Sequence, residues 1–157
     1  MFMKKRNWKV LILSLVVVYL IAFIGSLFTS QNTSSDWYES IRPSITPPNW
    51  VFPVVWNVLF FLIAIALYFS WIGSDKKQKK NIMFVYGINF FLNIFWSFLY
   101  FSLKNPRIAF FELIVLWLSI VSMIVVSYKI DKKAGYLLIP YLLWVSFAGI
   151  LNWLSIG

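Results

Sequence analysis

Five long apolar segments, separated by short polar ones, dominate the sequence of this chain. They cover residues 10–28, 51–72, 82–103, 108–128 and 134–156, and Glu112 is the one acidic or basic side chain inside them. A helix of about 20 residues crosses a hydrocarbon core ~30 Å thick. The segments are continuous rather than alternating, which favours helices over the strands of a membrane barrel. The pattern predicts an all-α membrane protein, a bundle of five transmembrane helices in a single domain covering residues 1–157.

The segment between the first two helices differs from the other connections. Residues 29–50 begin with polar side chains and then become rich in aromatic residues and proline, with Pro43, Pro47 and Pro48 close together. Proline fixes its own φ and restricts the residue before it, so a long, ordered loop is expected here, stiff and non-helical over residues 37–50. Two interpretations remain open: a lid over one end of the bundle, or a belt of aromatic side chains at the level of the lipid headgroups.

Composition supports the lipid bilayer as the main partner. The chain is 61% hydrophobic and 12% charged, whereas soluble domains carry about 25% charged residues. The absence of cysteine excludes a disulfide framework, and with histidine also absent the chain lacks the commonest metal ligands, so no metal site is expected. The net charge of +9 lies in short clusters between apolar runs, so no nucleic-acid partner is predicted.

The distribution of lysine and arginine predicts the orientation. One set of flanks holds eleven of them: Lys4, Lys5, Arg6, Lys9, Lys76, Lys77, Lys79, Lys80, Lys129, Lys132 and Lys133. The opposite flanks hold three: Arg42, Lys104 and Arg107. Because short positively charged flanks stay in the cytoplasm, we expect a multi-pass protein of the cytoplasmic membrane, with its N-terminus inside and its C-terminus outside.

Three separated motifs carry a family resemblance. Residues 37–56 read W-Y-E-S-I-R-P-S-I-T-P-P-N-W-V-F-P-V-V-W, residues 92–97 read L-N-I-F-W-S, and residues 140–152 read P-Y-L-L-W-V-S-F-A-G-I-L-N. In this order they resemble the tryptophan-rich sensory protein family, also called the translocator protein, TspO/MBR or peripheral benzodiazepine receptor family. The similarity covers the chain from about Trp8 to Asn152.

The resemblance implies a membrane receptor or sensor with a Trp-lined pocket near the end of the bundle that the first loop covers. Members of this family bind porphyrins, other tetrapyrroles, and synthetic isoquinoline carboxamide or benzodiazepine ligands. No cofactor is required, and a porphyrin would be the ligand or the substrate. Carried over position by position, the ligand-binding residues are Phe52, Val55, Trp56, Asn93, Trp96, Trp144, Ala148 and Leu151.

Helical spacing is consistent with such a pocket. Asn89, Asn93, Trp96 and Tyr100 share one face of the third span, and residues 141, 144, 148 and 152 share one face of the fifth. Amides inside a membrane turn toward the bundle interior, where they find hydrogen-bond partners. For Asn89 and Asn152 we predict hydrogen bonds that hold helices together. For Asn93, Trp96 and Trp144 the resemblance favours a place in the pocket.

The chemistry expected of a bound porphyrin is limited. Without histidine or cysteine a dedicated haem-iron site is not predicted, and the flat ring would stack on Trp56, Trp96 and Trp144. Arg42 is a candidate partner for the propionates, and an exposed loop charge is the alternative. Bacterial relatives are linked to light- and oxygen-dependent breakdown of protoporphyrin, which would make Trp56 and Trp144 the photochemical residues. No conventional catalytic constellation accompanies them, so the sequence leaves enzymatic turnover open.

Glu112 and the oligomeric state leave alternatives open. Pairing or snorkelling near Lys104 and Arg107 is expected for this carboxylate, with a proton relay in a small-molecule or tetrapyrrole transporter as the alternative. Gly87 is followed four residues later by Phe91, so no small-residue helix face predicts a dimer, although a homodimer is common among relatives. The sterol motif of the animal members is incomplete after Asn152, and sterol binding is not predicted.

Overall fold

In the computed structural model, which describes residues 6–157, all regular elements are helical. In chain order they are α1 (Trp8–Thr29), α2 (Asp36–Ile41), α3 (Val51–Gly73), α4 (Lys76–Ser97), the π-helical turn η1 (Phe98–Ser102), α5 (Pro106–Ile130), α6 (Lys132–Leu137) and α7 (Ile139–Leu154). Five helical stretches are long and apolar enough to cross a membrane, with α4 and η1 forming one and α6 and α7 another. The prediction of an all-α bundle of five transmembrane helices is confirmed.

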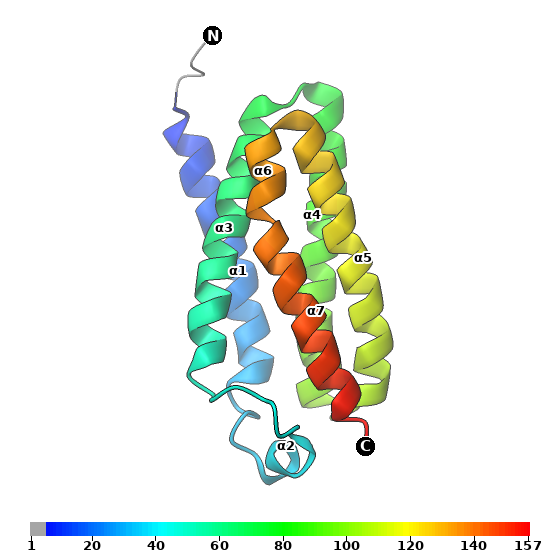
Figure 1. The fold of residues 1–157 in the computed structure, drawn as a ribbon. Coiled ribbons are helices and arrows are strands. Elements are labelled where there is room, and N and C mark those ends of the chain that lie inside the picture. Colours follow the sequence, from blue (N-terminus) through cyan, green and yellow to red (C-terminus); the bar gives the residue numbers. More distant parts are fainter. Residues whose placement is uncertain (1–5) are drawn as a thin grey trace.

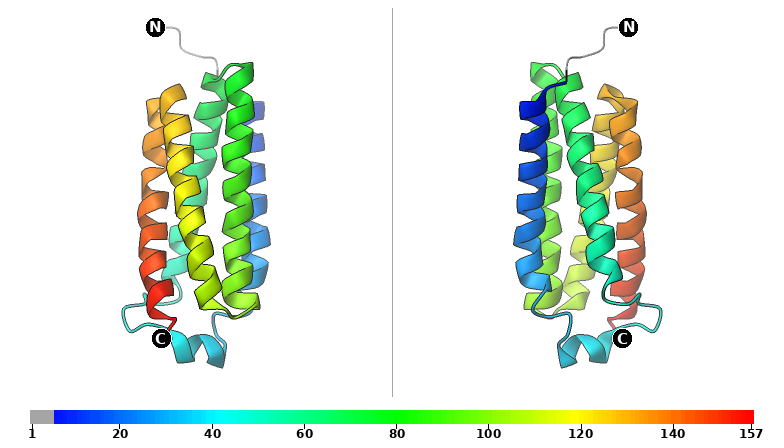
Figure 2. Two further views of the ribbon diagram at one scale, coloured as in Figure 1. Left: turned by 90° about the vertical axis from the view of Figure 1, so that its right-hand side faces the viewer. Right: turned by 90° about the vertical axis from the view of Figure 1, so that its left-hand side faces the viewer.

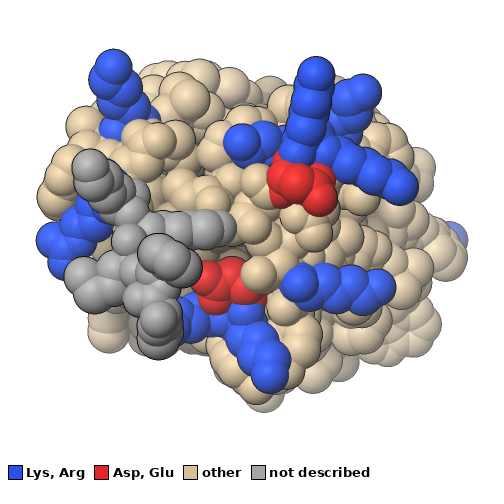
Figure 3. Space-filling view, turned by 90° about the horizontal axis from the view of Figure 1, so that it is seen from above, with Lys and Arg blue, Asp and Glu red and all other residues tan. Residues whose placement is uncertain are grey.

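The long helices run side by side, and the described chain begins and ends at opposite ends of the bundle (Figures 1 and 2). The basic end contains the start of α1 and the short connections from α3 to α4 and from α5 to α6. Lysine and arginine side chains surround this end in the view from above (Figure 3). Lys4 and Lys5 lie outside the described residues. The opposite, loop end contains residues 30–50, the turn from η1 to α5 and the C-terminus.

Side-chain caps account for the tight connections. Asp75 accepts a hydrogen bond from the Gln78 backbone, and the Gln78 side chain accepts one from the Asp75 backbone, so this capping box starts α4 well before the apolar segment begins. Asn105 caps α5 just before Pro106, and Asp131 caps α6. Each cap satisfies an amide that would otherwise lack a partner, which allows the chain to reverse within a few residues.

The connection at the loop end is not one long non-helical loop, because the short helix α2 interrupts it. The prediction of a non-helical segment is therefore wrong for Trp37–Ile41. The Ser35 hydroxyl caps the first turn by accepting from the Tyr38 amide at 3.2 Å, and Asp36 and Glu39 favour a helix N-terminus. The prolines begin only at Pro43, and Arg42 is already extended.

Two long spans depart from regular α-helix. Instead of one helix over residues 134–156, the fifth span breaks at Leu138 into α6 and α7, because Pro140 lacks an amide hydrogen and its ring crowds the carbonyl four residues earlier. The third span ends in η1, where the Leu103 amide bonds to the Phe98 carbonyl at 3.0 Å, one residue further back than in an α-helix. Both departures lie beside the interior of the bundle.

Candidate functional site

A cavity of about 560 Å³ lies inside the loop end of the bundle. Residues of α1, α3, α4, α5 and α7 form its walls, and Tyr38, Pro43, Thr46 and Asn49 of the connecting segment cover its end. Drug-sized ligands bind in cavities of roughly 300–1,000 Å³. Of the two interpretations of residues 29–50, the structure favours the lid.

The structure brings the predicted pocket residues together, with one exception. The cavity is lined by Phe52, Trp56, Asn93, Trp96, Trp144, Ala148 and Leu151. Val55 is not part of the lining; it packs against the buried core of the bundle. Adjacent helical residues point about 100° apart, so Val55 turns away from the face that carries Phe52 and Trp56.

Other aromatic rings hold the three indoles of the cavity wall. Trp56 stacks on Phe60 with ring centroids 5.4 Å apart, and Trp96 stacks on Tyr100 at 5.0 Å. Trp144 meets Phe52 edge to face at 5.8 Å. These contacts fix flat aromatic surfaces on three different helices around one space.

A chain of hydrogen bonds crosses the bundle beneath the cavity. The Asn93 amide donates to the Tyr141 hydroxyl at 3.0 Å, and that hydroxyl donates to Asn89 Oδ1 at 3.1 Å. Asn89 in turn donates to Ser119 Oγ at 2.9 Å, so α4, α5 and α7 share one polar network. The prediction that Asn89 holds helices together is confirmed, whereas Asn93 belongs both to this network and to the cavity wall.

A second set of bonds orients Trp96. Its indole nitrogen donates to Asn152 Oδ1 at 3.1 Å, and the Asn152 amide donates to the Pro106 carbonyl at 2.8 Å. Nearby, the Tyr100 hydroxyl of η1 donates to Ser155 Oγ at 3.1 Å. Asn152 therefore joins α4, α5 and α7, as its predicted structural role requires.

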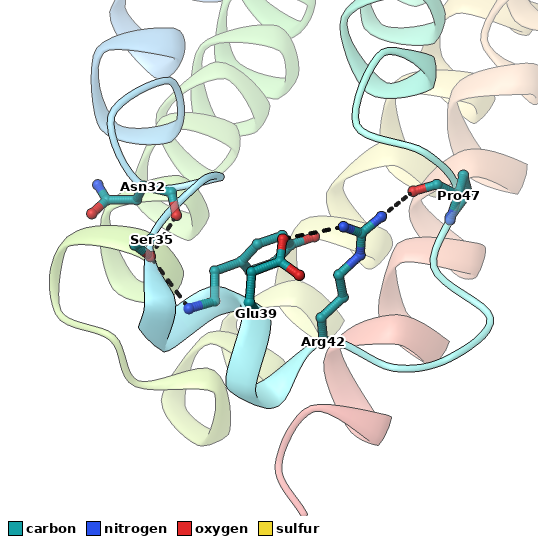
Figure 4. A network of polar contacts seen from close by, with 6 residues as sticks. Asn32, Ser35, Glu39, Arg42 and Pro47 are labelled. Carbon is teal, nitrogen blue, oxygen red and sulfur yellow. Dashed lines mark hydrogen bonds and ion pairs between the residues drawn. The ribbon is translucent and has the colours of Figure 1, made fainter.

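Arg42 fastens the covering segment rather than lining the cavity (Figure 4). Its guanidinium pairs with Glu39 at 3.3 Å and donates to the Pro47 carbonyl at 2.8 Å. The guanidinium carbon also lies 5.9 Å from the ring centroid of Tyr38, which does line the cavity. Burial raises the pKa of the Tyr38 hydroxyl, and the positive charge of Arg42 partly opposes that rise.

Glu112 does not pair near the membrane interface. Its side chain is turned inward, the residue is 8% exposed, and neither carboxylate oxygen has a hydrogen-bond partner among the residues that the structure describes. The ion pair that the structure shows among residues 6–157 joins Arg42 to Glu39 and does not involve Glu112. The expectation of pairing with Lys104 or Arg107 is wrong, because Glu112 shares the inward face of α5 with Leu113 and Leu116.

Sequence reasoning missed the wall that α1 contributes. Tyr19, Ala22, Gly25, Ser26 and Thr29 line the cavity, as does Asn57 on α3. Gly25 is buried, yet a Cβ atom built on it would meet no heavy atom within 4 Å, because it borders the open space. The small residues at positions 22, 25 and 26 are the one signal in the sequence that points to this wall.

The chain is similar to known membrane proteins along most of its length. A family model described as the TspO/MBR family matches residues 13–155. A tryptophan-rich protein TspO of Archaeoglobus fulgidus is 39% identical over 146 residues, covering 90% of this chain and 92% of that protein. The protein CrtK of Rhodobacter capsulatus is 32% identical over 143 residues, which are 89% of each chain. The translocator protein of Bos taurus is 27% identical over 134 residues, covering 83% of this chain and 79% of that protein.

Proposed function

The chain belongs to the TspO/MBR family of integral, multi-pass membrane proteins, and we propose that it is a receptor for a porphyrin or a related flat hydrophobic ligand. The observation that carries this proposal is the cavity at the loop end, in which Trp56, Trp96 and Trp144 present aromatic surfaces from three helices. A planar conjugated ligand stacks on such surfaces and leaves water or lipid at the same time.

The cavity also offers groups that select orientation. Ala148 lies one turn from Trp144 and leaves room beside the indole, while the Asn93 amide lies at the cavity wall. The apolar lining supplies most of the binding free energy, and a few polar groups set how the ligand lies. No cofactor is part of this proposal.

Titration with protoporphyrin IX in the dark, followed by tryptophan fluorescence of the detergent-purified protein, tests the proposal. We expect saturable quenching, and about a tenfold loss of affinity in Trp144→Ala because one stacking surface is removed. Trp153→Ala is the matched control, since Trp153 is 60% exposed and lies outside this cavity. Linear quenching that neither substitution changes would mean that the porphyrin partitions into detergent, and the proposal would fail.

We further propose that illumination with dioxygen leads to breakdown of the bound porphyrin, with Trp56 and Trp144 as the redox-active residues. Both indoles line the cavity, so they are within reach of a porphyrin bound there. A Trp56→Phe, Trp144→Phe variant keeps aromatic surfaces but loses the more easily oxidised indoles. It should bind porphyrin and bleach it more slowly; bleaching at the wild-type rate by a variant that still binds would contradict this step.

Glu112 favours a second candidate, a small-molecule or tetrapyrrole transporter. An intramembrane carboxyl without a protein partner among the described residues is the type of group that proton-coupled carriers use. Vesicles with an imposed proton gradient distinguish the candidates. Accumulation of the ligand that depends on the gradient and is lost in Glu112→Gln supports transport, whereas binding without accumulation supports the receptor.

We also propose that the basic end faces the cytoplasm of a cell membrane, which places the C-terminus outside. The chain lacks cysteine, so single cysteines introduced at Ser74 and Gly157 report on the two ends without background. An impermeant thiol reagent added to intact cells should label position 157 and not position 74. The reverse pattern would overturn the orientation.

The oligomeric state needs a separate measurement. Native mass spectrometry of the detergent-purified protein tests for a homodimer.

A further inference from the structure

The α1 and α3 walls of the cavity contain several exposed residues. These two helices pack against each other and run side by side in Figure 2. Four residues at the contact between α1 and α3 line the cavity and are exposed: Tyr19, Ser26, Pro53 and Asn57. Their exposed neighbours Leu20, Val54 and Val58 are apolar, as expected of a surface in contact with lipid. The cavity therefore has a side that faces the bilayer.

Asn57 is a polar residue in this otherwise apolar, lipid-facing surface. It lies six residues after the start of α3, about 9 Å along the helix at 1.5 Å per residue, and so inside the hydrocarbon region. An amide exposed to hydrocarbon is costly unless its polar atoms find partners. The Tyr19 hydroxyl donates to Asn57 Oδ1 at 2.8 Å and lies 3.3 Å from the Asn57 main-chain carbonyl. The Nδ2 group donates to no residue between positions 6 and 157.

Tyr19 determines what the Asn57 amide offers. Because Oδ1 accepts from the hydroxyl, the group left at the rim of the cavity is the NH₂, which is a donor only. Further along α1, about 9 Å from Tyr19, the cavity wall is open, since Gly25 carries no side chain and its Cβ position has free space around it. A donor with no protein partner, at the edge of an apolar cavity, is complementary to an acceptor oxygen on the occupant.

We infer that Asn57 Nδ2 is a bilayer-facing subsite that binds a carboxylate or carbonyl oxygen of the cavity's ligand. The inference rests on the proposed function and narrows its ligand class to flat apolar molecules that carry such an oxygen at their edge. A hydrogen bond to a carboxylate is stronger than one to a neutral group, and it is stronger again where water is excluded. Tyr19 acts as a positioning residue that holds the amide in this orientation.

The test pairs two ligands with three variants. Protoporphyrin IX carries two propionates, whereas etioporphyrin carries only alkyl groups on the same ring. Asn57→Asp keeps the acceptor for Tyr19 and, when ionised, removes the donor, and Asn57→Leu removes both without adding charge. Val58→Leu is the control, because Val58 is 54% exposed on the same helix and does not line the cavity. Size-exclusion chromatography checks that every variant is folded.

We expect both Asn57 variants to weaken protoporphyrin binding about tenfold and to leave etioporphyrin binding within about twofold of wild type. Val58→Leu should match wild type for both ligands. Equal loss of affinity for both porphyrins would mean that Asn57 contributes only packing. Unchanged affinity for protoporphyrin would mean that Asn57 does not contact the ligand. Either result would disprove the subsite without contradicting the proposed receptor function. If wild type binds neither porphyrin saturably, the proposed function fails and the subsite falls with it. If the wild-type protein binds protoporphyrin but not etioporphyrin, the protoporphyrin affinities of Asn57→Leu and Val58→Leu are compared. Weaker binding by Asn57→Leu alone supports the subsite, and equal affinities disprove it.

Discussion

The indole nitrogen of Trp96 donates a hydrogen bond to Oδ1 of Asn152 at 3.1 Å, joining α4 to α7. Asn152 is nearly fully buried, and its amide nitrogen continues the connection to the Pro106 carbonyl at the start of α5. One asparagine thus holds three helices together and sets the angle of an indole in the cavity wall. We therefore expect stability and ligand binding to be coupled at this position.

Replacing Asn152 by leucine tests that coupling. The change leaves the Trp96 indole hydrogen and the Pro106 carbonyl without their partner, which costs about 1–3 kcal/mol of folding free energy. Thermal denaturation in detergent should show a lower midpoint, and porphyrin affinity should fall because Trp96 loses its orientation. Asn57→Leu, at an exposed amide, should leave the midpoint close to wild type. Equal midpoints for the two variants would contradict the role of Asn152.

Filling the cavity from α1 should abolish ligand binding without harming the fold. A leucine at Gly25 extends into open space, because no heavy atom lies within 4 Å of the Cβ position, and it removes a helix-interior glycine that costs about 1 kcal/mol. Gly87→Leu is the matched control, since Gly87 also has free space around it but is exposed on α4 outside the cavity. Porphyrin titration and thermal denaturation of both proteins check this. Undiminished binding by Gly25→Leu would place the ligand elsewhere.

Gly135 allows α6 to pack closely against the end of α5. A Cβ atom there would lie 2.6 Å from Tyr128 Cβ and 3.0 Å from Tyr128 Cα, so the backbone would have to move. We expect Gly135→Ala to destabilise the protein by about 1–3 kcal/mol, as overpacking does. Gly87→Ala, with no such neighbour, should be neutral or slightly stabilising. Similar thermal midpoints for the two alanine variants would disprove the close packing.

Arg42 should act by holding the covering segment in place and not by binding a propionate of the ligand. Its two contacts, with Glu39 and with the Pro47 carbonyl, use the guanidinium in a geometry that lysine does not reproduce. Arg42→Lys and Arg42→Ala should therefore both speed dissociation of bound porphyrin, to a similar extent. Stopped-flow displacement measures these rates. If lysine restored the wild-type rate, Arg42 would instead bind a propionate by its charge.

Glu112→Leu should stabilise the protein. A buried carboxyl whose oxygens have no partner among the described residues costs folding free energy, and leucine of similar size replaces that cost with apolar contact. We expect a gain of about 1–3 kcal/mol in thermal or denaturant unfolding in detergent. A loss of stability would show that Glu112 has a partner in the native membrane protein, such as a bound lipid or ligand.

Local signals explain both the successes and the errors of sequence reasoning about the fold. The five spans followed from unbroken apolar length, a constraint that the bilayer imposes regardless of packing. Ser35 followed by Asp36 and Glu39 is a helix start, and Pro140 lies within an otherwise helical pattern, so α2 and the break at Leu138 were predictable from capping and proline rules. The π-helical turn η1 has no sequence signature, because only the contacts of its own neighbourhood favour the wider turn.

By itself, the sequence determined that five helices cross a bilayer, that basic side chains gather at one end, and that Asn89, Asn93 and Asn152 turn inward, because charges and amides are costly in hydrocarbon. The tertiary structure alone decided which faces meet. It excluded Val55 from the cavity, added the α1 wall with Gly25, and left Glu112 buried without a partner among residues 6–157. Helix periodicity shows which face of a single helix is the more polar. The rotation of each helix against its neighbours depends on side-chain packing across the whole bundle.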